Sequence, residues 1–205
     1  MKNIIIAGTG RAGKSTLAKR IKDELGHFVI NHDKLVATFG EAYPDLDIRI
    51  GNGEKSIENI APFIGHFLGM FSSFDGHGLF PYTQGALNEN FFVLEGWSFD
   101  FEQILPILKM YGIKDLKENF TLIGLVLNNK TVYELVSDMK KYDSEHDWTY
   151  GFNDNDLIKL AEENITYSQY SSKYLAKYGF ALYDTSIKRE QVLNQIIDDI
   201  KSNKL

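Results

Sequence analysis

The chain contains no cysteine, and this absence excludes a disulfide framework, a catalytic thiol and a cysteine-based metal site. It also contains no run of about 18 apolar residues, the length that a membrane-spanning helix needs. The opening residues MKNIII form too short an apolar run for a signal peptide, because glycine soon interrupts it. We therefore expect a cytoplasmic protein with no membrane partner.

Positive charge is also scarce. The 205 residues include 22 lysines and arginines against 28 aspartates and glutamates, and the formal net charge is −6. A general nucleic-acid binder usually carries a basic patch, so we expect no nucleic-acid partner. The length and the 43% hydrophobic content are those of a single domain over residues 1–205. These features are compatible with either a monomer or a homodimer.

Short apolar segments alternate with stretches of helical periodicity along the chain. The predicted strands are residues 4–7, 28–30, 91–94, 120–127 and 180–183. The predicted helices are 14–25, 34–39, 56–74 and 101–110, two helices within 130–177 joined near 147–155, and a last helix containing 192–200. Pro62 is expected to delay the start of its helix or to bend it. The alternation predicts an α/β fold, a three-layer sandwich with helices on both faces of a five-stranded parallel sheet.

The stretch GTGRAGKST, at residues 8–16, follows the first predicted strand and leads into a helix. It matches G-x-x-x-x-G-K-[ST], whose glycines let consecutive backbone N–H groups point at phosphate oxygens. The N-terminus of the following helix adds partial positive charge. Lys14 is expected to reach the β- and γ-phosphates, and Ser15 to ligate Mg²⁺. The predicted nucleotide-binding residues of this stretch are Gly8, Thr9, Gly10, Arg11, Ala12, Gly13, Lys14, Ser15 and Thr16.

A missing element bears on the base of the nucleotide. A GTPase reads guanine with an Asn-Lys-x-Asp sequence, and the nearest match, residues 129–132, is Asn-Lys-Thr-Val and lacks the aspartate. We therefore expect ATP rather than GTP. Arg11, inside the loop, could contact a nucleotide phosphate or extend into solvent, and both alternatives remain open here.

Polar residues follow the other predicted strands, at Asp33, Glu95 and residues 184–186. Ligands of parallel sheets bind beyond the carboxyl ends of the strands, so these residues are expected near the loop. Each also has a structural alternative. Asp33 would be a good N-cap for the helix at 34–39, and Thr185 or Ser186 for the last helix. Glu95 could be an acidic residue that faces solvent at the end of a strand.

The loop and the order of elements resemble those of the small P-loop kinases, a group that includes nucleoside monophosphate kinases, shikimate and gluconate kinases and chloramphenicol phosphotransferase. The resemblance covers nearly the whole chain and implies the P-loop NTPase fold, with strand order 2-3-1-4-5 and a helical lid at roughly 130–170. It implies that Asp33 lies in the acceptor site, where a carboxylate can orient or deprotonate a hydroxyl. It also implies that Glu95 holds Mg²⁺, directly or through water, and that the segment containing Thr185 lines the adenine.

The acceptor is harder to predict. The chain has only four arginines, whereas a phosphorylated acceptor is usually clamped by several guanidinium groups. Residues 138–163 carry eight acids and three lysines, which either repel a phosphorylated acceptor or simply form a solvated helical face. Arg49 is the arginine best placed for the acceptor region, and Trp97 is a candidate for stacking on a ring.

These residues together predict an ATP-dependent phosphotransferase that uses Mg²⁺ and acts on a hydroxyl of a nucleoside, sugar or other small metabolite. The alternatives are a nucleoside monophosphate kinase, and a nucleotide-binding regulatory protein or slow ATPase. The predicted catalytic residues are Lys14, Asp33 and Arg49, the predicted metal ligands are Ser15 and Glu95, and Thr185 completes the predicted nucleotide-binding set.

Overall fold

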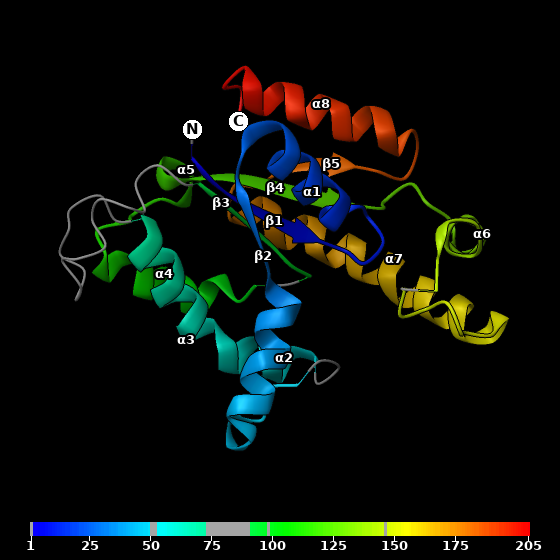
Figure 1. Cartoon of the computed structure of the whole chain (residues 1–205), viewed down its shortest axis with the longest axis horizontal. Helices are drawn as coiled ribbons and strands as arrows, with labels where there is room; N and C mark the ends of the chain where they lie inside the picture. Colours follow the sequence, from blue (N-terminus) through cyan, green and yellow to red (C-terminus); the bar gives the residue numbers. More distant parts are fainter. Residues whose placement is uncertain (1, 50–52, 73–90, 98, 146) are drawn as a thin grey trace.

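The computed structural model describes residues 2–49, 53–72, 91–97, 99–145 and 147–205, and Figure 1 shows their arrangement. The strands are β1 (Asn3–Gly8), β2 (Phe28–Asn31), β3 (Phe92–Glu95), β4 (Phe120–Val126) and β5 (Ala181–Asp184). The helices are α1 (Lys14–Leu25), α2 (His32–Ala42), the 3-10 turn η1 (Pro44–Leu46), α3 (Gly53–Ser72), α4 (Phe101–Met110), α5 (Leu116–Asn119), α6 (Val132–Tyr142), α7 (Asp154–Lys177) and α8 (Arg189–Lys201).

The five strands form one parallel sheet in the order β2-β3-β1-β4-β5, which confirms the predicted topology. The register aligns the carboxyl ends of the strands. Asn31 pairs with Glu95, Gly8 with Leu125, and Val126 with Asp184. The polar residues that follow the strands are therefore gathered at the carboxyl ends of the strands, where β1 leads into α1.

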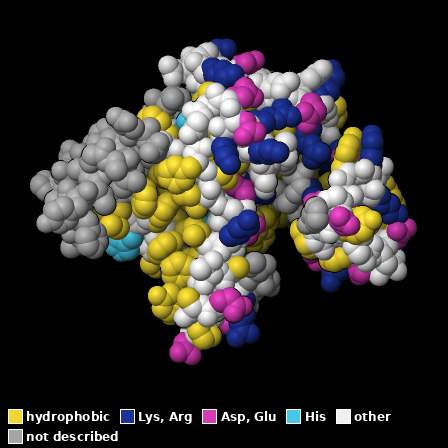
Figure 2. All heavy atoms as spheres, in the orientation of Figure 1, with side chains coloured by type: hydrophobic (Ala, Val, Ile, Leu, Met, Phe, Trp, Pro, Cys, Tyr) yellow, Lys and Arg dark blue, Asp and Glu magenta, His cyan; other side chains and the backbone are white. Residues whose placement is uncertain are grey.

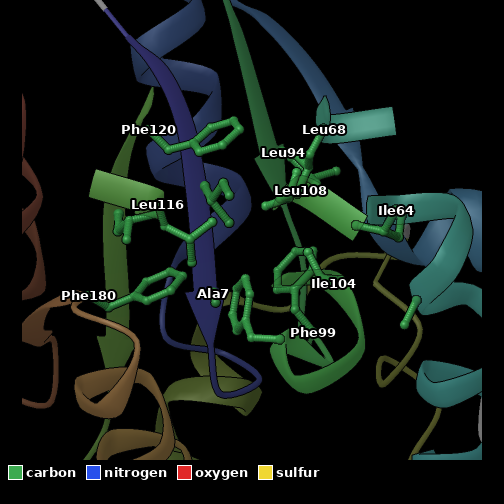
Figure 3. Packing of buried hydrophobic residues seen from close by; sticks show 14 of the residues in the cluster. Ala7, Ile64, Leu68, Leu94, Phe99, Ile104, Leu108, Leu116, Phe120 and Phe180 are labelled. Atoms are coloured by element: carbon green, nitrogen blue, oxygen red, sulfur yellow. The ribbon is translucent and has the colours of Figure 1, made fainter. Parts of the chain in front are cut away.

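Two hydrophobic clusters lie on opposite faces of the sheet, because successive side chains of a strand point to opposite sides. On one face Ile5 and Ala7 of β1 pack with side chains of α3 and α4, and Figure 3 shows Ala7 and Leu94 in this cluster with Ile104 and Leu108. On the other face Ile4 and Ile6 pack with α1, α6 and α8. The three-layer arrangement is therefore confirmed.

Helix α3 differs from its prediction at the proline. It begins at Gly53 rather than at 56 and continues through Pro62 to Ser72, so the predicted late start is wrong. Proline has no N–H, and the carbonyl of Glu58, four residues earlier, loses its usual partner. The Gln103 side-chain amide of α4 donates to that carbonyl at 3.2 Å. Residues 73 and 74, also predicted as helical, lie outside the described residues.

The helix caps also differ from their predictions. Asn31, not Asp33, caps α2, and its side chain accepts from the Lys34 N–H at 2.8 Å. The helix begins two residues earlier than predicted, and this puts Asp33 inside its first turn. Helix α8 begins after Lys188, whose backbone is left-handed with φ 54° and which makes no side-chain cap. Thr185 and Ser186 are therefore not its caps.

Helices α6 and α7 flank a connector, residues 143–153, at the far right of Figure 1. Thr131 and Glu134 form a capping box that starts α6, and Asn153 caps α7. From Asn164 onward α7 buries Ser168, Ser171 and Leu175 against the sheet. Within the described part of the chain, no helix combines the length and the apolar character needed to cross a membrane.

Candidate active site

The phosphate loop, residues 8–15, connects β1 to α1 and needs its first and last glycines. Gly8 has φ 139°, and a Cβ there would lie 2.0 Å from the Leu125 carbonyl oxygen. Gly13 has φ 95° and immediately precedes the first turn of α1. Both backbone conformations are readily adopted only by glycine. The loop therefore turns sharply and ends at a helix N-terminus, a geometry suited to binding an anion.

Lys14, Ser15 and Glu95 lie together at the end of the loop. The Ser15 hydroxyl donates to Glu95 Oε1 at 3.2 Å, and Glu95 is only 3% exposed. The Lys14 ammonium donates to the Thr9 carbonyl at 2.7 Å. Burial lowers the pKa of Lys14, and the nearby negative charges of Glu95 and Asp33 oppose that shift. The site thus combines one cation with two carboxylates and a hydroxyl.

Asp33 stands in the first turn of α2, beside the buried ring of His32. Their Oδ1 and Nδ1 atoms are 3.9 Å apart. Partial burial alone would raise the pKa of Asp33. The hydrogen bond and charge of His32, together with the charge of Lys14, outweigh it and hold the pKa below its usual range. The side chain is 56% exposed, so an ionised carboxylate faces open space next to the phosphate loop.

A pocket adjoins this carboxylate and contains three of the residues expected in the acceptor region. Asp33, Arg49 and Trp97 line it with His32, Val36, Ser56 and Ile57. Trp97 stacks on Tyr167 of α7, with ring centroids 4.5 Å apart, and the Tyr167 hydroxyl donates to the Trp97 carbonyl. The tryptophan is therefore a braced wall of the pocket.

Arg49 is held at this pocket by its backbone rather than by its guanidinium. Its N–H donates to the Ser56 hydroxyl, and that hydroxyl donates back to the Arg49 carbonyl, both at 2.8 Å. The Arg49 side chain is 71% exposed, and its Nε lies 3.8 Å from Asp47 Oδ1. Lys55 shares the same carboxylate at 2.6 Å. Arg49 can therefore reorient, with part of its charge already balanced.

The phosphate loop is held by residues that are distant in the sequence. The Thr9 hydroxyl donates to the Asn164 carbonyl of α7 at 2.8 Å, and a Cβ at Gly10 would lie 2.4 Å from Asn164 Oδ1. The Thr185 hydroxyl donates to the Ala12 carbonyl at 2.9 Å. Its side chain thus supports the loop, and a contact of its backbone with adenine stays a prediction. Thr16 is exposed on α1.

Arg11 does not extend into solvent, and its contact with a nucleotide phosphate stays a prediction. Its guanidinium makes two bonds to Asp143, Nη1 to Oδ1 at 2.7 Å and Nη2 to Oδ2 at 3.1 Å. It also approaches Asp147 at 3.5 Å and bonds to the Thr149 hydroxyl. Asp143 and Asp147 of the connector are therefore partners of the phosphate loop.

Cations from outside the acidic stretch at 138–163 balance part of its negative charge. Arg11 pairs with Asp143 and approaches Asp147, and Lys130 pairs with Asp138, whereas the pair of Asp154 with Lys140 at 2.7 Å lies within the stretch. Figure 2 shows basic and acidic side chains intermixed on the right-hand lobe, which carries α6 in Figure 1. Repulsion of an anionic acceptor by this stretch is consequently weaker than the count of charges suggests.

Two residues that position the site were not predicted from the sequence. Asn31 donates its side-chain amide to Glu95 Oε1 while its Oδ1 caps α2. Asn164 meets the loop at Thr9 and Gly10. The signal for Asn31 was present, since it is a favoured N-cap residue that directly follows a predicted strand. Asn164 lies inside a long helix, and no local pattern marks it.

The oxygen atoms of Ser15 and Glu95 fit a magnesium ion. Mg²⁺ prefers oxygen ligands and is commonly held by one or two carboxylates together with substrate phosphates and water. Across the described ranges, no group of three or more His, Cys, Asp or Glu side chains could hold a metal. This pair of ligands therefore suits an ion that shares its coordination with a phosphate.

No protein-family model matches the sequence, and no curated protein matches it either. Several solved structures match the fold. Shikimate kinase from Bacteroides thetaiotaomicron is 12% identical with a TM-score of 0.54, over 98% of this chain and 97% of the other. Shikimate kinase from Acinetobacter baumannii, in complex with shikimate, is 15% identical with a TM-score of 0.53, over 100% and 96%. A gluconokinase from Sinorhizobium meliloti 1021 is 12% identical with a TM-score of 0.51, over 100% and 98%.

At these identities the comparison shows the fold. The chain has the fold of the small-molecule P-loop kinases, with its five-stranded parallel sheet in the order 2-3-1-4-5. The matches cover nearly the full length of each chain, so the likeness is not confined to the phosphate loop.

Proposed function

We propose that the protein is an ATP-dependent kinase that transfers a phosphoryl group to a hydroxyl of a small molecule. The observation that carries the proposal is one continuous charged cluster. Lys14, Ser15 and Glu95 stand at the end of the phosphate loop, and the charges of Glu95 and Asp33 both act on Lys14. Asp33 at the same time lines an open pocket. A donor site and an acceptor site therefore adjoin.

Each residue of this cluster has a role suited to phosphoryl transfer, which depends on positioning and on stabilising charge. Backbone N–H groups of the phosphate loop and Lys14 would bind the phosphates. Ser15 and Glu95 would hold Mg²⁺, which neutralises charge that develops on the phosphate oxygens. The ionised carboxylate of Asp33 would accept a hydrogen bond from the acceptor hydroxyl and then its proton.

The pocket favours an acceptor with at most one negative charge. Among the described residues that line the pocket, Arg49 is the single lysine or arginine, and Asp47 already balances part of its charge. Clamping a phosphate typically takes several guanidinium groups. The braced ring of Trp97 would suit an acceptor that presents a ring or an apolar face, such as a nucleoside or a sugar.

The test is the rate of ADP formation from Mg-ATP, alone and with nucleosides, nucleoside monophosphates, sugars, sugar acids and aminoglycosides. We expect one class of uncharged or singly charged hydroxyl compounds to stimulate the rate. Lys14→Ala should remove the stimulated rate, because the transferring group loses its cation. Lys19→Ala is the matched control, since Lys19 is an exposed lysine of the same helix.

The outcomes separate the alternatives. Stimulation by a nucleoside monophosphate would identify a monophosphate kinase. Tight nucleotide binding with no stimulation by any acceptor would identify a regulatory protein or a slow ATPase. Full activity in Lys14→Ala would sink the kinase proposal.

A further inference from the structure

Arg11 occupies a backbone position that suits glycine better. Its φ is 62°, in the left-handed region that non-glycine residues adopt at a cost in free energy. It lies between Gly10 and Ala12 in the phosphate loop, so glycine there would relieve the cost without a change of backbone path. The arginine side chain must therefore contribute something that offsets the strained backbone.

The contribution visible in the structure is a shielded ion pair with the connector. Asp143, the carboxylate that takes two bonds from Arg11, is 7% exposed, and the Arg11 side chain is 20% exposed. The Thr149 hydroxyl, from a residue only 2% exposed, bonds to both Arg11 and Asp143. Two parallel bonds between a guanidinium and a carboxylate fix direction as well as distance.

The connector is itself folded around this contact. The Asp147 carboxylate, 3.5 Å from Arg11, accepts from the N–H and hydroxyl of Ser144. The Trp148 ring lies 6.0 Å from the Arg11 guanidinium and packs against Phe152. Backbone bonds from Tyr150 to Asp147 and from Phe152 to Thr149 close the turns. The guanidinium thus sits at the centre of a compact loop.

We propose that Arg11 is a positioning residue that fixes the first half of the phosphate loop to the connector, so that nucleotide affinity depends on Asp143. This inference rests on the proposed function only in taking the loop to bind ATP and ADP. The neighbouring contacts support it, because Thr9 and Ala12 are also held by residues outside the loop, and Arg189 donates to the Arg11 carbonyl at 3.2 Å. A shift of the connector would therefore move the backbone amides of the loop that bind the phosphates.

The experiment compares Arg11→Gly, Asp143→Asn and the double variant by calorimetric titration with Mg-ADP. Glycine tolerates φ 62°, so Arg11→Gly isolates the side chain from the backbone. We expect each single change to weaken binding by about tenfold, a typical coupling between linked sites, and the double variant to be no weaker than Arg11→Gly. Asp154→Asn is the control, since its pair with Lys140 is exposed and does not involve the loop. Its affinity should stay within about twofold of the unchanged chain.

The opposite pattern would overturn the inference. If Arg11 served the phosphates directly, Asp143→Asn would release it and leave Mg-ADP binding unchanged or tighter, while Arg11→Gly would weaken it. Additive losses in the double variant would also contradict the proposal. Should Asp143→Asn fail to fold, Arg11→Lys serves instead. It keeps the charge but not the two parallel bonds, and it should weaken binding in the same direction.

A second readout is independent of any nucleotide. Hydrogen exchange of the Ser144, Asp147, Tyr150 and Phe152 amides should accelerate in Arg11→Gly and Asp143→Asn but not in Asp154→Asn. If the unchanged chain does not bind Mg-ADP but exchange is faster in the two variants, the proposed function is wrong and the contact between Arg11 and the connector still stands. If both variants bind Mg-ADP normally and their exchange is unchanged, the positioning role of Arg11 is wrong and the proposed function is unaffected.

Discussion

Individual residues at the site derive their chemistry from their neighbours. Asp33 is half exposed, yet His32 and Lys14 keep its pKa low, so it is a carboxylate at neutral pH and can accept a hydrogen bond at once. Burial lowers the pKa of Lys14, although Glu95 and Asp33 oppose the shift. The same few side chains therefore set the charge states of Asp33, the proposed proton acceptor, and of Lys14, the cation that we propose binds the phosphates.

These two shifts predict the pH dependence of kcat/KM, which reports groups of the free enzyme. The midpoint of the acid limb, due to Asp33, should lie below its ordinary pKa of about 3.9. The midpoint of the alkaline limb, due to Lys14, should lie below the ordinary lysine pKa of about 10.4. Asp33→Asn should lower kcat by about 10²-fold or more, because the hydroxyl loses its proton acceptor. A pH-rate profile of both forms tests this. An acid limb near pH 6 that persists in Asp33→Asn would assign it to another group.

At the scale of the elements, side chains of one element form hydrogen bonds with backbone groups of a neighbouring helix. Asn31 ends β2, caps α2 and bonds to Glu95, so one residue links α2 to the predicted metal ligand. Gln103 of α4 serves α3 in a similar way by bonding to the Glu58 carbonyl that Pro62 leaves without its helical partner. The proline is therefore accommodated within a continuous helix.

Because of this contact, the effects of changes at Gln103 and Pro62 should be coupled. Gln103→Ala should lower the free energy of unfolding by about 0.5–1 kcal/mol, the usual net value of such a hydrogen bond. In a Pro62→Ala background the new N–H can bond to Glu58, and the cost of Gln103→Ala should shrink. Urea unfolding of the four forms measures the coupling. Equal costs in both backgrounds would show that the amide does not substitute for the missing N–H.

The molecule as a whole is a parallel sheet covered on both faces, and its stability should depend on pH through His27. This side chain is 1% exposed, packs on Phe91, and has no hydrogen-bond partner at Nδ1 within the described residues. Burial lowers the pKa of its imidazole. The folded chain therefore resists a proton that the unfolded chain accepts.

Stability should consequently fall as the pH drops from 7 to 5. Below the ordinary histidine pKa of about 6.5 the unfolded state takes up a proton more readily than the folded state does, and the slope from this one group can reach at most about 1.4 kcal/mol per pH unit. The lowered pKa of Asp33 acts in a separate window, below about pH 4. His27→Phe keeps a ring and should flatten the decline, as measured by chemical unfolding at each pH. An unchanged slope would place the proton elsewhere.

Much of the fold could be predicted from the sequence, because the signals are local. Continuous apolar runs mark buried parallel strands, and the glycines at 8 and 13 permit backbone angles that other residues resist. The loop, the order of elements and the strand order followed from these patterns and from the resemblance that they carry. The caps that the sequence offered as structural alternatives for α2 and α8 were wrong, since each helix start had several competing polar residues.

Only the tertiary structure decided which charged side chains meet. Arg11 and Asp143 are 132 positions apart, and Asn31 and Glu95 are 64 apart, so no periodicity within one element could pair them. Their contacts depend on strand register and on where α6 ends above the loop. By itself the sequence determined a phosphate-binding loop at the carboxyl ends of the strands of a parallel sheet. Only the folded chain pairs Arg11 with Asp143 of the acidic stretch, because the burial and the orientation of both side chains depend on how the helices pack around the sheet.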